Sequence, residues 1–220
     1  MSIAKENAAK GTLKFIEDGM VVGLGSGTTT AYFIDLLGKK IKEERISIVG
    51  VATSFDSEIM AKKAGIPLMP LEKKLDLAID GADIVKKEYV LKGGGGALTR
   101  EKIVDYAAEK FIVIADEEKT KPEATYPVVV EVIPFAYQYV IKELRELGLE
   151  AELRVGGKKL GPVVTDNSNF ILDCNGKVSG TPEEFERKLN TIPGVVENGV
   201  FSKFWKIILG NENGSREMEL

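Results

Sequence analysis

The first half of the chain alternates short apolar runs with longer amphipathic segments, and this alternation restricts the possible folds more than any other feature. Strands are predicted at 20–24, 46–51, 66–71, 75–80, 90–92 and 111–115, and helices at 3–17, 29–41, 55–63 and 99–109. The strand runs are almost wholly apolar, which is typical of strands buried on both faces of a sheet. Strands of this kind joined by helices form right-handed βαβ units. We therefore predict an α/β domain with a Rossmann-like, mostly parallel sheet.

The pattern changes near the prolines at 122 and 127. A strand at 128–132 is followed by a helix at 135–147, strands at 150–155 and 170–173, a helix opening at Thr181-Pro182, and a strand at 195–201. The order β-α-β-β-α-β is that of a ferredoxin-like α+β module. A run at 205–209 is expected to return to the first sheet, and the polar tail from Asn211 is expected to fray. We predict an α/β domain of 1–126 plus 203–220 and a smaller domain of 127–202.

Composition excludes several classes of function. The 220 residues hold 30 Lys and Arg against 34 Asp and Glu, a net charge of −4, which disfavours nucleic acid as a partner. The absence of histidine removes Ser-His-Asp and Cys-His catalysis and His-ligated metals. Cys174, the single cysteine, is expected to be a packed residue rather than a reactive thiol. No apolar run is long enough to span a membrane and no signal peptide is evident, so a cytoplasmic location without membrane attachment is expected.

A glycine-rich turn follows the first predicted strand, in the sequence Gly23-Leu24-Gly25-Ser26-Gly27-Thr28-Thr29-Thr30. Between a strand and a helix, such a turn gathers backbone N–H groups at a helix N-terminus, where the dipole favours an anion. The dinucleotide fingerprint fails because Thr28 stands where its third glycine belongs, and the P-loop lysine is missing. The motif favours a small phosphorylated metabolite over a nucleotide, although hydroxyl groups that merely cap a tight turn would look the same.

Two further motifs carry acids and a lysine. Asp80-Gly81-Ala82-Asp83 ends a predicted strand, at the sheet edge that binds ligands in open α/β folds. These acids could share acid–base work, bind Mg²⁺ or cap a turn. Lys92-Gly93-Gly94-Gly95-Gly96 leads to a helix start that carries Glu101, which could equally be an ordinary first-turn acid. Four consecutive glycines are expected only where positive φ or close ligand approach requires them.

This set of groups suits proton abstraction next to a carbonyl. That reaction needs a carboxylate base and a cation or donors to hold the enediolate oxygen. Aldose–ketose isomerisation is such a reaction, and it requires no redox cofactor.

The sequence resembles the A-type ribose-5-phosphate isomerase family over nearly its whole length. The matching stretches are 23–29, 80–83, 92–95, 98–102, 114–116, 130–134, 163–167 and 192–196. The resemblance implies a larger α/β domain with a smaller α+β domain, in homodimers or homotetramers, acting on a sugar phosphate without a metal or other cofactor. Within the second domain, 163–167 is expected to serve turn structure or a subunit contact.

The resemblance also implies roles for individual residues. Glu101 would be the general base and Lys92 would stabilise the enediolate charge. Asp80 would assist opening of the furanose and, with Asp83, hold hydroxyls. The implied substrate-binding residues are Lys5, Ser26, Gly27, Thr28, Thr29, Asp80, Gly81, Ala82, Asp83, Lys92, Gly93, Gly94, Gly95 and Lys119.

Two other classes of function compete with this reading. A non-enzymatic sugar-phosphate sensor would use the same binding loops, but such proteins usually carry a basic DNA-binding module, and no segment here is basic enough. Mg²⁺-dependent phosphoryl transfer would use Asp80 and Asp83 as metal ligands, but no nucleotide motif accompanies them.

Overall fold

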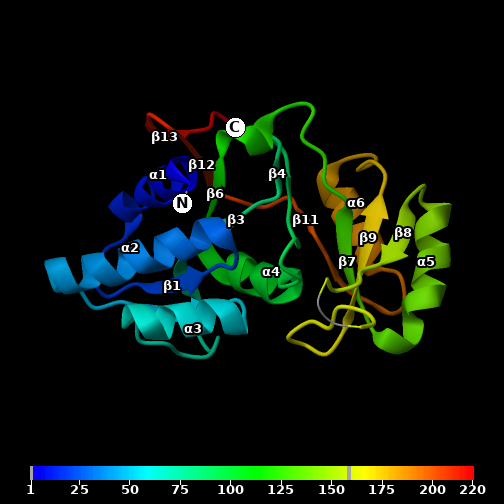
Figure 1. The fold of residues 1–220 in the computed structure, drawn as a ribbon, viewed down its shortest axis with the longest axis horizontal. Helices are drawn as coiled ribbons and strands as arrows, with labels where there is room; N and C mark the ends of the chain where they lie inside the picture. Colours follow the sequence, from blue (N-terminus) through cyan, green and yellow to red (C-terminus); the bar gives the residue numbers. More distant parts are fainter. Residues whose placement is uncertain (1, 158–159) are drawn as a thin grey trace. The chain divides into compact units, whose positions relative to one another are not determined.

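The computed structural model describes residues 2–157 and 160–220 and divides them into two compact units (Figure 1). The first unit comprises Met1–Ala82, Arg100–Lys121 and Lys203–Leu220, and the second comprises Asp83–Thr99 and Pro122–Ser202. Two of the four unit boundaries therefore fall between Ala82 and Asp83 and between Thr99 and Arg100, and the other two follow Lys121 and Ser202. The chain enters the second unit directly after Asp80-Gly81-Ala82 and leaves it directly before Arg100 and Glu101.

The first unit is built on a six-stranded sheet in the order β13-β12-β6-β3-β1-β2. Its strands are β1 (Val21–Leu24), β2 (Val49–Ala52), β3 (Leu75–Gly81), β6 (Ala108–Asp116), β12 (Lys206–Asn211) and β13 (Gly214–Glu217). Every pairing is parallel except the antiparallel pair β12–β13. This confirms the predicted mostly parallel sheet and the return of the chain after 203 to complete it.

Helices pack on both faces of this sheet. The helical elements are α1 (Ile3–Lys10), η1 (Leu13–Phe15), α2 (Thr28–Glu44), α3 (Phe55–Ala64), α4 (Leu98–Ala107) and η2 (Glu117–Thr120). In Figure 1 the blue helices α1 and α2 lie together, and they share a core with the alternate residues of β1, β3 and β6. On the other face Val104 of α4 packs with Val51 and Leu75. Gly23 in β1 leaves room there, since a Cβ would lie 2.8 Å from Val104 Cγ1.

The second unit contains a four-stranded antiparallel sheet in the order β10-β7-β9-β8. Its elements are β7 (Val128–Val132), η3 (Pro134–Ala136), α5 (Tyr137–Glu146), β8 (Glu150–Leu153), β9 (Phe170–Asn175), α6 (Pro182–Asn190) and β10 (Val195–Asn198). With strands numbered by their order in the chain, this is 4-1-3-2, and each helix connects the strands as a split βαβ motif requires. A small sheet of β4 (Ile84–Val85), β5 (Val90–Leu91) and β11 (Val200–Phe201) completes the unit.

Four local predictions were wrong. The helix predicted at 3–17 ends at Lys10, where the Gly11 N–H caps it and the Thr12 hydroxyl bonds the Ala9 carbonyl, so only a 3-10 turn follows. The run 66–71 forms no strand, only a bridge from Leu68 to Gly50. Residues 108–109 begin β6 instead of continuing the helix. The polar tail does not fray: β13 pairs with β12 as an exposed edge strand, which explains its polar sequence.

The predicted strand 195–201 is divided at Gly199. β10 pairs with β7, whereas β11 pairs with β5. The Gly199 carbonyl accepts the Lys92 N–H at 2.9 Å, and a Cβ at Gly199 would overlap the Lys92 carbonyl. The glycine therefore lets two backbones approach closely next to Lys92.

Cys174 lies on β9 within the core of the second unit and has no exposed surface, as predicted. Burial raises the pKa of its thiol to about 12, so the thiol stays protonated at neutral pH. We expect the native protein at pH 8 to resist an aromatic disulfide reagent, and the denatured protein to release one equivalent of chromophore. Rapid reaction of the native protein would contradict this assignment.

Candidate functional site

The carboxyl ends of the parallel strands β1, β2 and β3 share an edge of the first unit's sheet. The turn 25–27 follows β1, Thr53 and Ser54 follow β2, and Asp80 and Gly81 end β3. Because this edge is where open α/β sheets bind ligands, the residues there form the candidate site of the first unit.

Asp80 is fully buried and holds the turn after β1 in place. Its Oδ1 accepts the backbone N–H of Ser26 at 3.1 Å and that of Gly81 at 2.6 Å. The Gly25 N–H also donates to the Ile79 carbonyl at 3.0 Å. A Cβ at Gly25 would overlap the Asp80 carboxyl, so only glycine allows this approach.

A cluster of hydroxyl groups adjoins the same turn. The Ser26 hydroxyl donates to Ser54 Oγ at 2.6 Å and lies 2.8 Å from Thr53 Oγ1. Ser54 is also the N-cap of α3 and forms a capping box with Ser57. Sequence reasoning missed the contact of Thr53 and Ser54 with Ser26, because it depends on the parallel pairing of β1 with β2.

The N-terminus of α2 is open to solvent. Its N-cap is Gly27, which has φ +104° and is exposed together with Thr28, while Thr29 is half-buried. The first N–H groups of a helix have no intrahelical partner and favour an anion. Lys5 of α1 donates to Thr28 Oγ1 at 2.8 Å, so it adds a positive charge at this terminus. The structure therefore brings Lys5, one of the predicted binding residues, to this loop.

Glu101 lies in the first turn of α4 and only 5% of it is exposed. The neighbouring Arg100 guanidinium stacks 4.8 Å from the ring centroid of Phe55, the first residue of α3. This contact places the N-terminus of α4 beside that of α3, at the same sheet edge. Lys119 lies in η2, which begins directly after β6 and therefore follows another carboxyl end.

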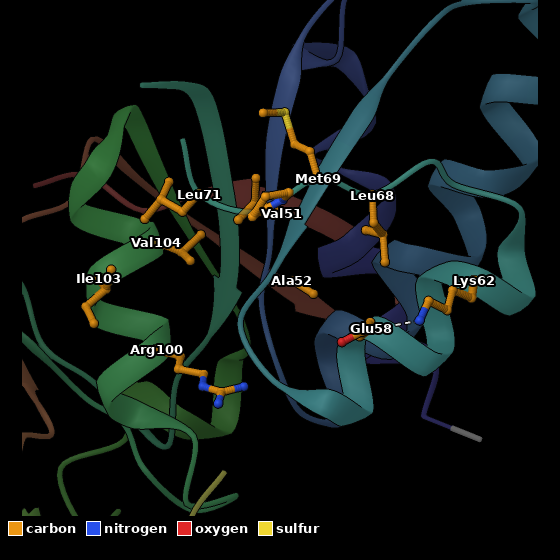
Figure 2. A pocket seen from close by; sticks show the side chains of 11 residues that line it. Val51, Ala52, Glu58, Lys62, Leu68, Met69, Leu71, Arg100, Ile103 and Val104 are labelled. Atoms are coloured by element: carbon orange, nitrogen blue, oxygen red, sulfur yellow. Dashed lines mark hydrogen bonds and ion pairs between the residues drawn. The ribbon is translucent and has the colours of Figure 1, made fainter. Parts of the chain in front are cut away.

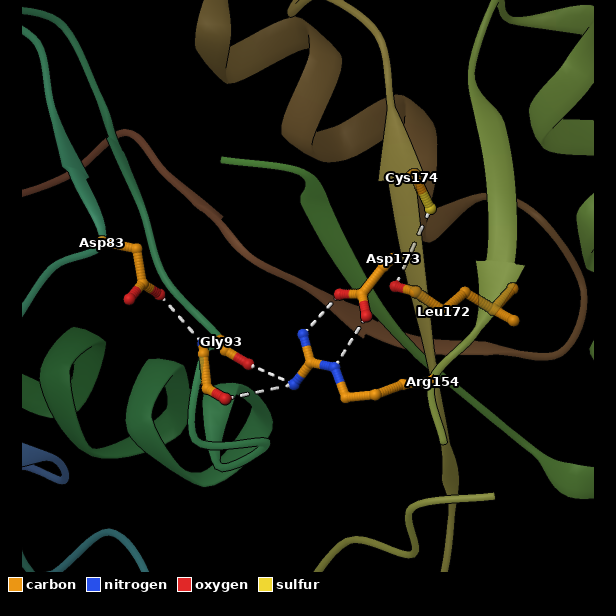
Figure 3. A network of polar contacts seen from close by, with 7 residues as sticks. Asp83, Gly93, Arg154, Leu172, Asp173 and Cys174 are labelled. Carbon is orange, nitrogen blue, oxygen red and sulfur yellow. Dashed lines mark hydrogen bonds and ion pairs between the residues drawn. The ribbon is translucent and has the colours of Figure 1, made fainter. Parts of the chain in front are cut away.

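Ala82 is the last residue of the first unit before Asp83, and the second unit holds Asp83, Lys92 and the glycines after it. Lys92 directly follows β5 and is 2% exposed, with Nζ 5.4 Å from the centroid of the Phe201 ring. Asp83 donates its N–H to the Leu91 carbonyl at 2.8 Å, and its Oδ2 accepts the Gly94 N–H at 2.9 Å (Figure 3). The structure thus brings Asp83 and the start of the glycine segment together.

The glycines after Lys92 have separate structural reasons. Gly93 has φ +115°, and a Cβ there would lie 2.8 Å from Val129 Cβ. At Gly94 a Cβ would lie 2.8 Å from Asp83 Oδ1 and 2.9 Å from the Tyr126 hydroxyl. Gly95 is exposed, and apart from its chain neighbours nothing lies within 4 Å of the place that a Cβ would take. Close packing therefore explains the first two glycines, and the third leaves an open surface.

Glu131, fully buried on β7, anchors the first turn of α4 through Thr99. Its carboxylate accepts the Thr99 hydroxyl at 2.6 Å, the Thr165 hydroxyl at 2.9 Å and the side-chain amides of Asn167 and Asn169. Thr99 stands two residues before Glu101. The segment 163–167 therefore serves turn structure, one of the two roles predicted for it.

A cavity of about 560 Å³ lies in the first unit, between α3 and α4. Figure 2 shows the side chains that line it. Its lining is mainly apolar, with an ion pair between Glu58 and Lys62 and with Arg100 at its border. None of the predicted site residues is among those that line it.

Two features of residues 2–157 and 160–220 bear on other functions. No group of three or more Asp, Glu, Cys or His side chains there is arranged to hold a metal ion. No helix in the same residues has both the length and the apolar character needed to cross a membrane.

A Rossmann-like sheet joined to a ferredoxin-like module, with polar and acidic residues at the carboxyl edge of the sheet, is the architecture of an α/β enzyme whose ligand binds at that edge. The family model for ribose 5-phosphate isomerase A matches residues 49–214. The chain belongs to this family and is an isomerase.

Similar proteins span nearly the whole chain. Ribose-5-phosphate isomerase A of Methanococcus aeolicus is 51% identical over 213 residues, covering 94% of this chain and 91% of the relative. The structure of the Methanocaldococcus jannaschii isomerase has 45% identity and a TM-score of 0.94, with 98% of each chain covered. A D-ribose-5-phosphate isomerase in complex with phospho-erythronic acid has 48% identity and a TM-score of 0.94, covering 98% of this chain and 97% of that one.

The close approach of Gly25 to Asp80 can be tested directly. In Gly25→Ala the new methyl group displaces the Asp80 carboxyl, and we expect kcat/KM to fall by about 10²-fold. Gly157→Ala is the matched control, because no described residue other than its chain neighbours lies within 4 Å of the place that its new methyl group would take. Steady-state isomerase assays on both variants decide the matter; a Gly25→Ala enzyme with normal kcat/KM would show that Asp80 need not be held in place.

Proposed function

We propose that this enzyme interconverts D-ribose 5-phosphate and D-ribulose 5-phosphate through an enediolate, with Glu101 as the general base. The observation that carries the proposal is the buried Glu101 carboxylate in the first turn of α4, at the ligand-binding edge of the sheet. Membership of the family supports the substrate.

The phosphate is assigned to the N-terminus of α2. Exposed backbone N–H groups, the Thr28 hydroxyl and the Lys5 ammonium provide charge-assisted donors there. Ser26 and Thr29 adjoin the same turn, and Lys119 lies at a neighbouring carboxyl end. The relative that holds phospho-erythronic acid, a phosphorylated sugar acid, supports a ligand of this kind.

The proton transfers balance without an added oxidant or reductant. Glu101 removes the C2 proton of the open-chain aldose, and the C2–H electron pair becomes the C1–C2 double bond as negative charge moves to the carbonyl oxygen. Glu101 then returns the proton to C1, while the proton on O2 is transferred to O1. A single carboxylate on one face of the enediolate performs both steps.

The other polar residues are assigned supporting roles. Lys92 stabilises the charge that develops on the enediolate oxygen, an interaction that strengthens in the transition state. Asp80, oriented by the Ser26 and Gly81 N–H groups, assists opening of the furanose, and Asp83 helps to hold substrate hydroxyls. Gly81, Ala82 and Gly93–Gly95 supply backbone beside these groups.

Glu101→Gln tests the general base. The amide keeps the shape of the side chain but accepts no proton, so we expect kcat to fall by about 10²- to 10⁴-fold with little change in KM. The assay follows ribulose 5-phosphate formation with excess EDTA present. Glu109→Gln, an exposed acid paired with Lys74, is the control and should retain activity. Near-normal turnover by Glu101→Gln would remove Glu101 from the base role.

Lys92→Met tests the stabilising cation. Methionine keeps a long apolar side chain at this position but lacks the charge, so we expect kcat to fall by about 10²- to 10³-fold, with KM changing much less. Lys87→Met, an exposed lysine of the same unit, is the control. A variant that loses affinity but keeps kcat would instead make Lys92 a binding group.

A further inference from the structure

Arg154 follows β8 in the second unit, and its side chain forms hydrogen bonds with the backbone of the glycine segment after Lys92 (Figure 3). Its Nη1 donates to the Gly93 carbonyl at 2.8 Å and reaches the Gly94 carbonyl at 3.3 Å. Only 14% of the Arg154 side chain is exposed. Hydrogen bonds from a guanidinium to backbone carbonyls stabilise one loop conformation without involving the loop's side chains. A segment of glycines, which has no side chains, can be held in this way.

Asp173 on β9 orients Arg154. Nε donates to Asp173 Oδ2 at 2.8 Å, and Nη2 pairs with the other carboxylate oxygen, so the two side chains meet in a planar, bidentate arrangement. Burial alone would lower the pKa of Arg154, but the hydrogen bonds and charge of Asp173, with smaller contributions from Tyr126 and Asp83, raise it above its ordinary value. Arg154 is therefore charged and fixed in direction.

The same turn is held from its other side by Asp83. The Gly94 N–H donates to Asp83 Oδ2, while the Gly94 carbonyl faces Arg154. Gly93, the residue immediately after Lys92, is fixed through its carbonyl, and the Lys92 N–H is fixed by Gly199. The backbone around Lys92 is thus constrained before and after the residue, and the Asp83 carboxylate is constrained by the same turn.

We propose that Arg154, oriented by Asp173, is a positioning residue that sets the geometry of Lys92 and Asp83 for the isomerisation. It acts through the Gly93 and Gly94 carbonyls rather than by touching substrate. The inference rests on the roles proposed above for Lys92 and Asp83. The roles proposed for Lys92 and Asp83 do not themselves involve a side chain of the ferredoxin-like module. Arg154 and Asp173 therefore add two positioning residues from that module.

The proposal predicts a particular kinetic signature. Arg154→Met keeps a long apolar stem but releases both carbonyls, and small displacements of catalytic groups can cost large factors in rate. We expect kcat to fall by about 10- to 100-fold with KM within about threefold, because the phosphate-binding groups lie in the first unit and keep their contacts. In Arg154→Lys the ammonium group can reach one carbonyl but lacks the several N–H donors of the guanidinium group. The activity of this variant should therefore lie between those of the unmodified enzyme and Arg154→Met.

The coupling of the pair provides a second readout. Asp173→Asn weakens the orientation of Arg154 and should lower kcat by a smaller factor than Arg154→Met does. The double variant should be no slower than Arg154→Met alone, since both changes act through one contact. Arg145→Met is the matched control: its side chain is 58% exposed and lies 3.7 Å from Glu150. All rates are taken at 25 °C on protein whose folded fraction is confirmed by circular dichroism.

The outcomes separate this inference from the proposed function. Normal kcat in folded Arg154→Met and Asp173→Asn, while Lys92→Met is impaired, overturns the positioning role alone. If Lys92→Met and Asp83→Asn are themselves fully active, the proposed roles fail first. Additive losses in the double variant, or a rise in KM at constant kcat, would also contradict the proposal. Should Arg154→Met not fold, Asp173→Asn and Arg154→Lys still decide the question through the split between kcat and KM.

Discussion

The Asp80 carboxylate bonds the backbone of the turn after β1, and the candidate site of the first unit depends on this interaction. Parallel pairing of β1 with β3 brings the turn to the end of β3, and Gly25 permits the contact. The turn in turn places Ser26 against Thr53 and Ser54 and starts α2 at Gly27. The buried Asp80 carboxylate thus stabilises the turn through hydrogen bonds, and it lies at the sheet edge where open α/β folds bind ligands.

A chain without histidine must perform acid–base chemistry with groups that ordinarily titrate far from neutrality. The proposed mechanism uses Asp80, Lys92 and Glu101, which are buried, each at the end of a strand or the start of a helix. Burial fixes their positions and removes them from water, which strengthens their electrostatic effects. The glycine segment has no side chains that could hold it in place. Hydrogen bonds from its backbone to Asp83 and Arg154 fix its conformation instead.

The order of elements was predictable from the sequence because buried parallel strands are nearly uniformly apolar, and the β-α-β-β-α-β module has its own spacing. The ends of elements and the polar edge strand were less predictable. Gly11 ends α1 earlier than the apolar pattern indicates, and β13 is polar because it is an exposed edge strand. In the site, the residues of the glycine-rich turn and the acids stood out through local motifs. Arg154, Asp173, Thr53 and Tyr126 did not, since their contacts join residues far apart in sequence, such as Arg154 with Gly93. Only the strand pairings make such neighbours visible.

The central claim, proton transfer by Glu101 through an enediolate, is tested most directly with ribose 5-phosphate deuterated at C2. During turnover in ordinary water, the deuteron resides on the Glu101 carboxyl between its removal from C2 and its return to C1, and there it can exchange. Nuclear magnetic resonance of the ribulose 5-phosphate product should show part of the label lost to solvent and the remainder at C1. Complete retention of the label at C1 throughout the reaction would point to hydride transfer and contradict the account.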